Sequence, residues 1–248
     1  MPDELCDLAG QSSIDLSFEQ PVETIESNLM GTLHLLEAIR FVGRPIKFYG
    51  SGSSECFGDT GSVGANEGTP FRPRSPYAVA KVCGYNLVAN YRDAYGMHAS
   101  SGILFHHESP LWPERFVKQK IIRSAARIAS GKADSLTIGN LDIHLDRGWA
   151  PEYVDAMWRM LQQNDPADCM IATGRSASLE EFVTLALCHF GLGWRKYVRH
   201  DVTLLRPSDI RFGAADPSLA RERHGWKSSV SLEDLIPRMC RTAEAEVS

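Results

Sequence analysis

The fold is decided by residues 46–55, which read Ile-Lys-Phe-Tyr-Gly-Ser-Gly-Ser-Ser-Glu. The apolar start predicts a strand over residues 46–51, and the small residues that end it predict a turn. Residues 76–94 then predict a helix, because Pro76 suits a first helical turn. A strand that leads through a loop (residues 59–76) into a helix is the unit from which parallel sheets are built.

The same alternation of short apolar runs and longer amphipathic stretches continues along the chain. Further strands are predicted at residues 5–9, 99–105, 136–138 and 169–173. Further helices are predicted at residues 19–41, 116–130, 152–161, 179–190, 217–224 and 232–244. Gly43 is expected to end the first of these helices. The whole pattern predicts an α/β fold with a parallel sheet.

The composition argues against several classes of partner. The chain has 248 residues, and 43% of them are hydrophobic, which suits one large globular unit or two small ones. Its net charge is −5 and its basic residues form no run, so no nucleic-acid partner is expected. The six cysteines form no CxxC pair, and no apolar run is long enough for a membrane span. With no signal peptide at the start, these features predict a cytoplasmic protein without a membrane partner.

Chemistry is expected where the strand at residues 46–51 meets the helix at residues 76–94. Tyr77 and Lys81 are four residues apart, so both project from one helix face, and the ammonium is expected to lower the pKa of the phenol. Ser53 and Glu55 follow the strand at the edge where active sites of open α/β sheets gather. Plainer interpretations remain open: an exposed helical tyrosine beside a solvated lysine, and serines that form a turn or a cap.

Six runs of sequence carry a resemblance to a known family, at residues 47–58, 69–81, 102–110, 139–142, 153–158 and 171–174. The two longest read Lys-Phe-Tyr-Gly-Ser-Gly-Ser-Ser-Glu-Cys-Phe-Gly and Thr-Pro-Phe-Arg-Pro-Arg-Ser-Pro-Tyr-Ala-Val-Ala-Lys. On these runs the chain resembles the GDP-mannose 4,6-dehydratases, which are extended short-chain dehydrogenases. The resemblance covers nearly the whole chain and begins at the family's fourth strand.

The resemblance implies a partial Rossmann-like, doubly wound parallel sheet whose first strands are missing, together with a smaller mixed α/β substrate region. Residues 1–107 and 141–174 are expected to form the partial NADP-binding domain. Residues 108–140 and 175–248 are expected to bind the sugar nucleotide. The implied activity is that of a lyase in nucleotide-sugar metabolism, on the route to GDP-fucose, which converts GDP-mannose to GDP-4-keto-6-deoxymannose with transient reduction of NADP. A homo-oligomer, dimer or tetramer, is also implied.

Site residues follow from the same resemblance. Tyr77, helped by Lys81 and Ser53, is expected to take the proton of the sugar 4-hydroxyl, and Glu55 the C5 proton. The expected cofactor contacts are Leu8, Ala9, Gln11, Tyr77, Lys81 and His107. The expected substrate contacts are Ser54, Glu108, Lys120, Arg206 and Asp209. No metal site is expected, because the histidines and carboxylates show no metal-ligand spacing.

The sequence also departs from the family. No GxGxxG or GxxGxxG run opens a strand–turn–helix, the device that places a pyrophosphate on a helix N-terminus. His106 stands where the family has Asn, and Leu111 and Trp112 stand where it has two Arg. The family's Arg-Asp-Trp-Gly is Leu-Asp-Arg-Gly at residues 145–148.

These departures leave two alternatives to an active dehydratase. One is a catalytically impaired homologue with a structural or oligomerisation role. The other is an NADP-dependent epimerase or reductase of another nucleotide sugar, although Glu55 argues against it because those reactions need no C5 base.

Overall fold

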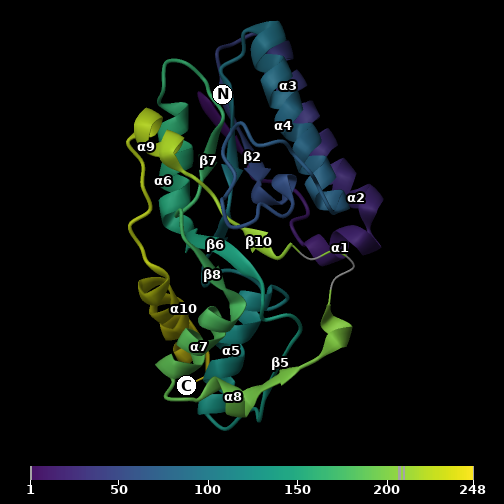
Figure 1. The fold of residues 1–248 in the computed structure, drawn as a ribbon. Coiled ribbons are helices and arrows are strands. Elements are labelled where there is room, and N and C mark those ends of the chain that lie inside the picture. Colours follow the sequence, from purple (N-terminus) through teal and green to yellow (C-terminus); the bar gives the residue numbers. More distant parts are fainter. Residues whose placement is uncertain (1, 206–207, 209, 248) are drawn as a thin grey trace.

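The computed structural model describes residues 2–205, 208 and 210–247. Within them, the larger sheet has four strands in the order β1-β2-β3-β7 (Figure 1). These strands span Glu4–Asp7, Lys47–Ser53, Ala99–Leu104 and Cys169–Ile171. All three pairings between them are parallel. The predicted α/β fold with a Rossmann-like parallel sheet is therefore confirmed.

Helices cover both faces of this sheet, because neighbouring side chains of a strand point to opposite faces. Phe48 of β2 packs against Leu36 and Val88 on one face. Tyr49, the next residue, packs against Met157 on the other face. The helices on the first face are α3 (Gly31–Val42) and α4 (Pro76–Tyr95), and those on the second are α6 (Ala150–Leu161) and α9 (Ser218–His224) (Figure 1).

The predicted single helix over residues 19–41 is wrong in its first half. The region instead holds α1 (Ile14–Glu19), α2 (Pro21–Ile25), a π-helical turn η1 (Glu26–Met30) and α3. Crowding before a proline disfavours helical backbone, and Gln20 accordingly has φ −129° and ψ 64°. Gly43 ends α3 as expected, with φ 65°.

A largely buried ion pair ties α4 to the start of β7. The guanidinium of Arg92 donates to both carboxylate oxygens of Asp168, at 2.9 and 2.7 Å, and to the carbonyl of Ala99 at 2.9 Å. The same carboxylate accepts from the backbone N–H of Ser101 at 2.7 Å. Removing the arginine would leave a carboxylate charge without its partner in a poorly hydrated place.

We therefore expect Arg92→Met to lower the free energy of unfolding by about 3 kcal/mol. Arg40→Met is the matched control, because the Arg40–Glu37 pair lies exposed on α3 and should contribute under about 1 kcal/mol. Urea denaturation of both variants measures the difference. Equal losses from the two substitutions would contradict this account of the buried pair.

A second, smaller sheet follows the first and was not predicted as a sheet. Its parallel strands lie in the order β10-β6-β4, and β8 pairs antiparallel with β6. The strands span His106–Glu108 (β4), His144–Trp149 (β6), Ser176–Ser178 (β8) and Phe212–Gly213 (β10). They are short and rich in polar residues, so their sequences lack the apolar runs that mark strands.

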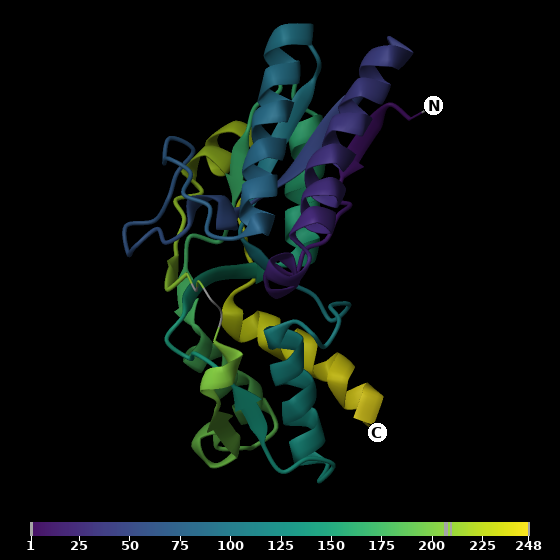
Figure 2. The same ribbon diagram turned by 90° about the vertical axis from the view of Figure 1, so that its right-hand side faces the viewer.

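Three helices form a separate apolar cluster beside this second sheet. They are α5 (Val117–Ala129), α7 (Leu179–His189) and α10 (Leu232–Val247). Ile121, Phe182 and Leu235 are fully buried among them. Figure 2 shows the cluster below the main sheet, with the chain's C-terminal end at its edge. The remaining elements are η2 (Ser54–Phe57), β5 (Leu136–Ile138), α8 (Trp194–Tyr197), β9 (Val198–His200) and η3 (Val202–Leu204).

None of the helices in the described ranges has both the length and the apolar character needed to cross a bilayer. The proposed division into residues 1–107 with 141–174, and 108–140 with 175–248, stays a prediction.

Asp146 of β6 is a buried carboxylate that holds the turn after β7. It accepts hydrogen bonds from the N–H of Thr173 at 2.9 Å, the hydroxyl of Thr173 at 2.9 Å and the N–H of Gly174 at 2.7 Å. Burial nevertheless raises the pKa of Asp146 to about 6, although these hydrogen bonds act to lower it. The folded chain therefore binds this proton more tightly than the unfolded chain does.

The stability that this proton contributes is fully present below pH ~4 and is lost as the pH rises through ~6. We expect the free energy of unfolding to fall by roughly 2 kcal/mol between pH 4 and pH 6, and we expect Asp146→Asn to remove that fall. Denaturation of both proteins at several pH values between 4 and 6 measures it. Asp93→Asn, at an exposed carboxylate, should keep the fall. If the stability of Asp146→Asn falls with pH as that of the wild type does, Asp146 is not the group that causes the fall.

Candidate active site

The carboxyl end of β2 delivers the first group of candidate residues. Ser53 ends the strand, and its hydroxyl accepts from the N–H of Glu55 at 3.3 Å, which caps the short helix η2. Ser53, Ser54 and Glu55 are each 8–9% exposed. A local cap therefore explains why a hydroxyl and a carboxylate meet here in largely buried positions.

The start of α4 brings the second group to the same place. Ser75 caps this helix by accepting from the N–H of Ala78 at 3.1 Å, and Pro76 occupies its first turn. Tyr77 is thereby placed close enough to Ser53 for the serine side chain to act on the pKa of the phenol. Ser53, Glu55, Tyr77 and Lys81, which the sequence proposed as a group, thus come together around the end of β2.

Lys81 is held differently from the sequence-based expectation. Its ammonium donates to the carbonyl of Ser51 at 3.0 Å and to its hydroxyl at 3.1 Å. It lies 5.8 Å from the centre of the Tyr77 ring. Burial lowers the pKa of Lys81, while the nearby Asp7 and Cys56 act to raise it.

The pKa of Tyr77 lies above its ordinary value, which corrects the expectation that Lys81 would lower it. Burial of the phenol is the main cause, and the hydrogen bond from Ser53 counteracts it only in part. The neighbouring side chains of Cys56 and Glu55 raise this pKa further. In this arrangement Tyr77 is a phenol that needs additional positive charge nearby before it gives up its proton.

His106 of β4 lies beside Glu55, with 3.8 Å between Nε2 and a carboxylate oxygen. The sequence showed this residue only as a departure from the family, and the structure makes it a neighbour of the candidate base.

His107 faces the other side of the strand, where its ring lies 5.1 Å from that of Tyr153. Its carbonyl accepts from the indole N–H of Trp112 at 3.1 Å.

The other predicted substrate contacts are more scattered. Glu108 is 4% exposed and lies 3.8 Å from the ammonium of Lys118. Lys120 is in the first turn of α5, near Asp201, whose pKa is lowered mainly by hydrogen bonding with Thr203 and also by Lys120. Arg206 and Asp209 lie outside the described residues.

The predicted cofactor contacts Leu8, Ala9 and Gln11 follow β1, next to the end of β2. Leu8 is 55% exposed, and the N–H of Ala9 donates to Asp7 at 3.3 Å. The Gln11 amide donates to the carbonyl of Ser13 at 2.8 Å. The sequence analysis did not include Asp7 among the site residues, although its charge acts on Lys81. Its position as a polar residue at the carboxyl end of a parallel strand could have identified it.

One GxxGxxG spacing does occur in the chain, at Gly58, Gly61 and Gly64. All three glycines have positive φ, from 62° to 84°. They lie in the loop between η2 and α4, and no helix starts behind them. A β-carbon on Gly64 would stand 3.2 Å from the backbone of Ala215, so this glycine permits close packing of two loops. The spacing is therefore not a phosphate-binding turn.

Comparison with known sequences agrees with this arrangement. The sequence profile of the family described as GDP-mannose 4,6 dehydratase matches residues 1–239. GDP-mannose 4,6 dehydratase 2 of Arabidopsis thaliana is 44% identical over 242 residues, which cover 96% of this chain and 65% of that relative. A GDP-mannose 4,6-dehydratase of Sinorhizobium fredii is 43% identical over 259 residues, which cover 97% of this chain and 74% of that relative. The chain thus spans about two thirds of the length of the Arabidopsis relative.

Solved structures share the fold at low identity. RMD from Pseudomonas aeruginosa, complexed with NADPH, matches with a TM-score of 0.91 and 24% identity, over 99% of this chain and 82% of the other. The dTDP-glucose 4,6-dehydratase DesIV from Streptomyces venezuelae, with NAD and TYD bound, matches with a TM-score of 0.89 and 19% identity. This match covers 98% of this chain and 73% of the other. These likenesses concern the fold alone. The profile match and the two relatives show that the chain belongs to the GDP-mannose 4,6-dehydratase family.

Proposed function

We propose that this chain carries the sugar-converting groups of a GDP-mannose 4,6-dehydratase, a lyase that forms GDP-4-keto-6-deoxymannose. The observation that carries the proposal is the meeting of Ser53, Glu55, Tyr77 and Lys81 around the end of β2. A phenol and a separate carboxylate in one largely buried site match a reaction that needs two different proton acceptors.

Tyr77 is the proposed base at the sugar 4-hydroxyl. The Ser53 side chain acts to lower the pKa of Tyr77 and so favours the phenolate. The hydrogen bonds of Lys81 go to Ser51 and hold the end of β2, and its ammonium lies 5.8 Å from the centre of the Tyr77 ring. Its positive charge and that of the oxidised cofactor ring would together offset the raised pKa of Tyr77.

Glu55 is the proposed base at C5. A ketone at C4 acidifies the neighbouring C5–H bond, so a carboxylate can remove that proton. The electron pair left on C5 then forms a double bond to C6 as the C6 hydroxyl departs with a proton as water. His106, 3.8 Å away, is placed to stabilise the carboxylate form of Glu55 when its ring is protonated.

The proposed cofactor is NADP, and the residues fit its nicotinamide-ribose end. An ammonium has three N–H donors, and Ser51 takes two of those on Lys81, which leaves one for a ribose hydroxyl. Leu8, Ala9 and Gln11 lie beside this position after β1. When bound, the nicotinamide would supply a hydride acceptor for sugar C4 and a hydride donor for C6, and C5 would take a proton from solvent as C6 is reduced. For the pyrophosphate end, the described residues provide no glycine-rich turn at the start of a helix.

GDP-mannose is the proposed substrate, and its sugar would lie over Ser54 and Glu55. Lys120, in the first turn of α5, and the predicted pair Arg206 and Asp209 are the proposed nucleotide contacts.

A catalytically impaired homologue is the second candidate, and Trp112 favours it. The Trp112 ring packs 4.5 Å from that of Phe116, and its N–H is bonded to the His107 carbonyl, so it fills space where the family motif has an arginine. An epimerase or reductase is disfavoured by Glu55, which such reactions do not need. A homo-oligomer remains part of the proposal, supported by the exposed apolar side chains of Val22 on α2 and Val79 on α4. A cytoplasmic location is likewise kept as part of the proposal.

Calorimetric titration of NADP into the chain, with and without GDP-mannose, tests the proposal. Each lost charged contact to phosphate weakens binding by roughly 1.5–3 kcal/mol. We therefore expect weak but saturable binding, followed by formation of a 4-keto sugar when GDP-mannose is present. A folded chain that binds no NADP would instead support the impaired homologue.

A further inference from the structure

His106 and Glu55 come together because they follow two paired strands at matching positions. Ser53 of β2 pairs with Leu104 of β3, and Glu55 and His106 each lie two residues further along the chain. The Nε2 atom of His106 is 3.8 Å from a carboxylate oxygen of Glu55. The register of the main sheet thus places an imidazole and a carboxylate side by side at the edge where active sites of parallel sheets form.

The surroundings strengthen the electrostatic interaction between these two side chains. The side chain of His106 is 22% exposed and that of Glu55 is 11% exposed, so little water screens them. In water a glutamic acid loses its proton at pH ~4.3 and an imidazolium at pH ~6.5, and a close opposite charge moves these values further apart. Near neutral pH the attraction therefore favours a carboxylate beside an imidazolium, which is a base and an acid in one site.

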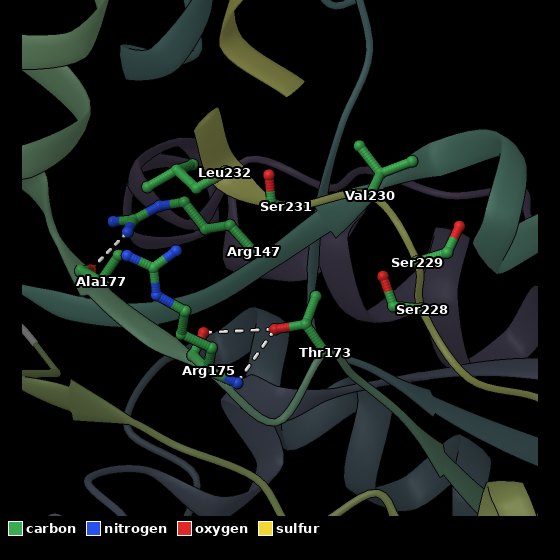
Figure 3. A pocket seen from close by; sticks show the side chains of 9 residues that line it. All are labelled: Arg147, Thr173, Arg175, Ala177, Ser228, Ser229, Val230, Ser231 and Leu232. Carbon is green, nitrogen blue, oxygen red and sulfur yellow. Dashed lines mark hydrogen bonds between the residues drawn. The ribbon is translucent and has the colours of Figure 1, made fainter. Parts of the chain in front are cut away.

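Other charged and titratable groups pack around the pair. Arg147 of β6 is opposite His106 in the β4–β6 ladder, and its guanidinium donates to the carbonyl of Ala177 at 2.6 Å (Figure 3). Its positive charge is offset by three carboxylates, those of Glu108, Asp146 and Glu181. On the α4 side, Tyr77 is a neutral phenol near neutral pH because burial raises its pKa. Arg147 therefore opposes protonation of His106 less than the contact with Glu55 favours it.

We propose that His106 is a catalytic acid of the dehydration, which gives a proton to the departing C6 hydroxyl while Glu55 takes the proton from C5. This inference rests on the proposed function. The family has Asn where this chain has His106, and an amide has no acidic proton to give. The acid is therefore a feature of this chain and not of the family motif.

The proposed step balances in atoms and in charge. The C5–H bond breaks, its proton passes to Glu55, and the electron pair forms the double bond between C5 and C6. The C6–O bond breaks with its electron pair, and the oxygen takes the proton of His106 and leaves as water. Glu55 is then a carboxylic acid beside a neutral imidazole. One proton transfer between the two side chains, directly or through one water molecule, restores both.

A leaving group that needs no proton tests the acid. GDP-6-deoxy-6-fluoromannose loses fluoride in place of hydroxide, and fluoride departs as an anion. We expect His106→Asn to dehydrate GDP-mannose about 100-fold more slowly than the wild type but to release fluoride at nearly the wild-type rate. Single-turnover measurements in saturating NADP give both rates. His34→Asn, at an exposed histidine of α3, is the matched control and should match the wild type on both substrates.

Two further variants complete the test. His106→Gln is made in parallel, so that a folding defect of one variant does not decide the result, and it should show the same contrast. Glu55→Gln should be slow on both substrates, because both still need removal of the C5 proton. Equal slowing of the His106 variants on both substrates, or no slowing on either, would overturn the acid and leave the proposed function standing. A wild-type chain that converts neither substrate would overturn both.

Discussion

Replacing Tyr77 by phenylalanine will lower kcat for dehydration of GDP-mannose by about 10²–10⁴-fold. The variant loses the phenol oxygen beside Ser53 that we propose removes the proton of the 4-hydroxyl. The ring remains, so packing at the start of α4 should persist and the affinity for GDP-mannose should change only a few-fold. Product formation in saturating NADP, followed by mass spectrometry, measures the loss.

Tyr95→Phe is the control for this prediction. Tyr95 is the last residue of the helix whose first turn holds Tyr77, and it is 52% exposed. It should leave kcat unchanged. If Tyr77→Phe turns over as fast as Tyr95→Phe, another group takes the proton and the assignment of Tyr77 is wrong.

Glu55→Gln will stop the reaction after oxidation at C4. The amide keeps the size of the side chain and its place in η2 but cannot accept the C5 proton, so elimination of water should slow by about 10²–10⁴-fold. In deuterated water the wild type should place solvent deuterium at C5, and the variant should not. Mass spectrometry of the recovered sugar nucleotide reads both effects.

Glu23→Gln, at an exposed carboxylate of α2, should behave like the wild type. Two outcomes distinguish the role of Glu55. If Glu55→Gln still oxidises C4 but no longer eliminates water, Glu55 is the base at C5. Unimpaired dehydration by Glu55→Gln would show that the carboxylate is structural, for example as part of the η2 cap.

Much of the main sheet could be predicted from the sequence, because its elements depend on local patterns. The strand at residues 46–51 and the helix at residues 76–94 lie within one or two residues of β2 and α4. The small sheet could not be predicted, since β4 and β6 are held by pairing with each other rather than by apolar runs. The broken helix before α3 shows the same limit, because Pro21 outweighed the helical spacing around it.

The candidate site was predictable in its membership but not in its electrostatics. Spacing placed Tyr77 and Lys81 on one helix face, and β2 brought Ser53 and Glu55 to them. Spacing could not show that the Lys81 ammonium donates to Ser51, nor that burial dominates the pKa of Tyr77. Both depend on how deeply the end of β2 is enclosed.

The most direct test of the proposed dehydratase chemistry follows the hydrogen on C4. GDP-mannose that carries deuterium at C4 would be incubated with the chain and NADP, and the product analysed by mass spectrometry and NMR. The account predicts loss of one water with the deuterium recovered on C6 of a 4-keto sugar. Deuterium retained at C4, in unchanged substrate or in a C4 epimer, would contradict it.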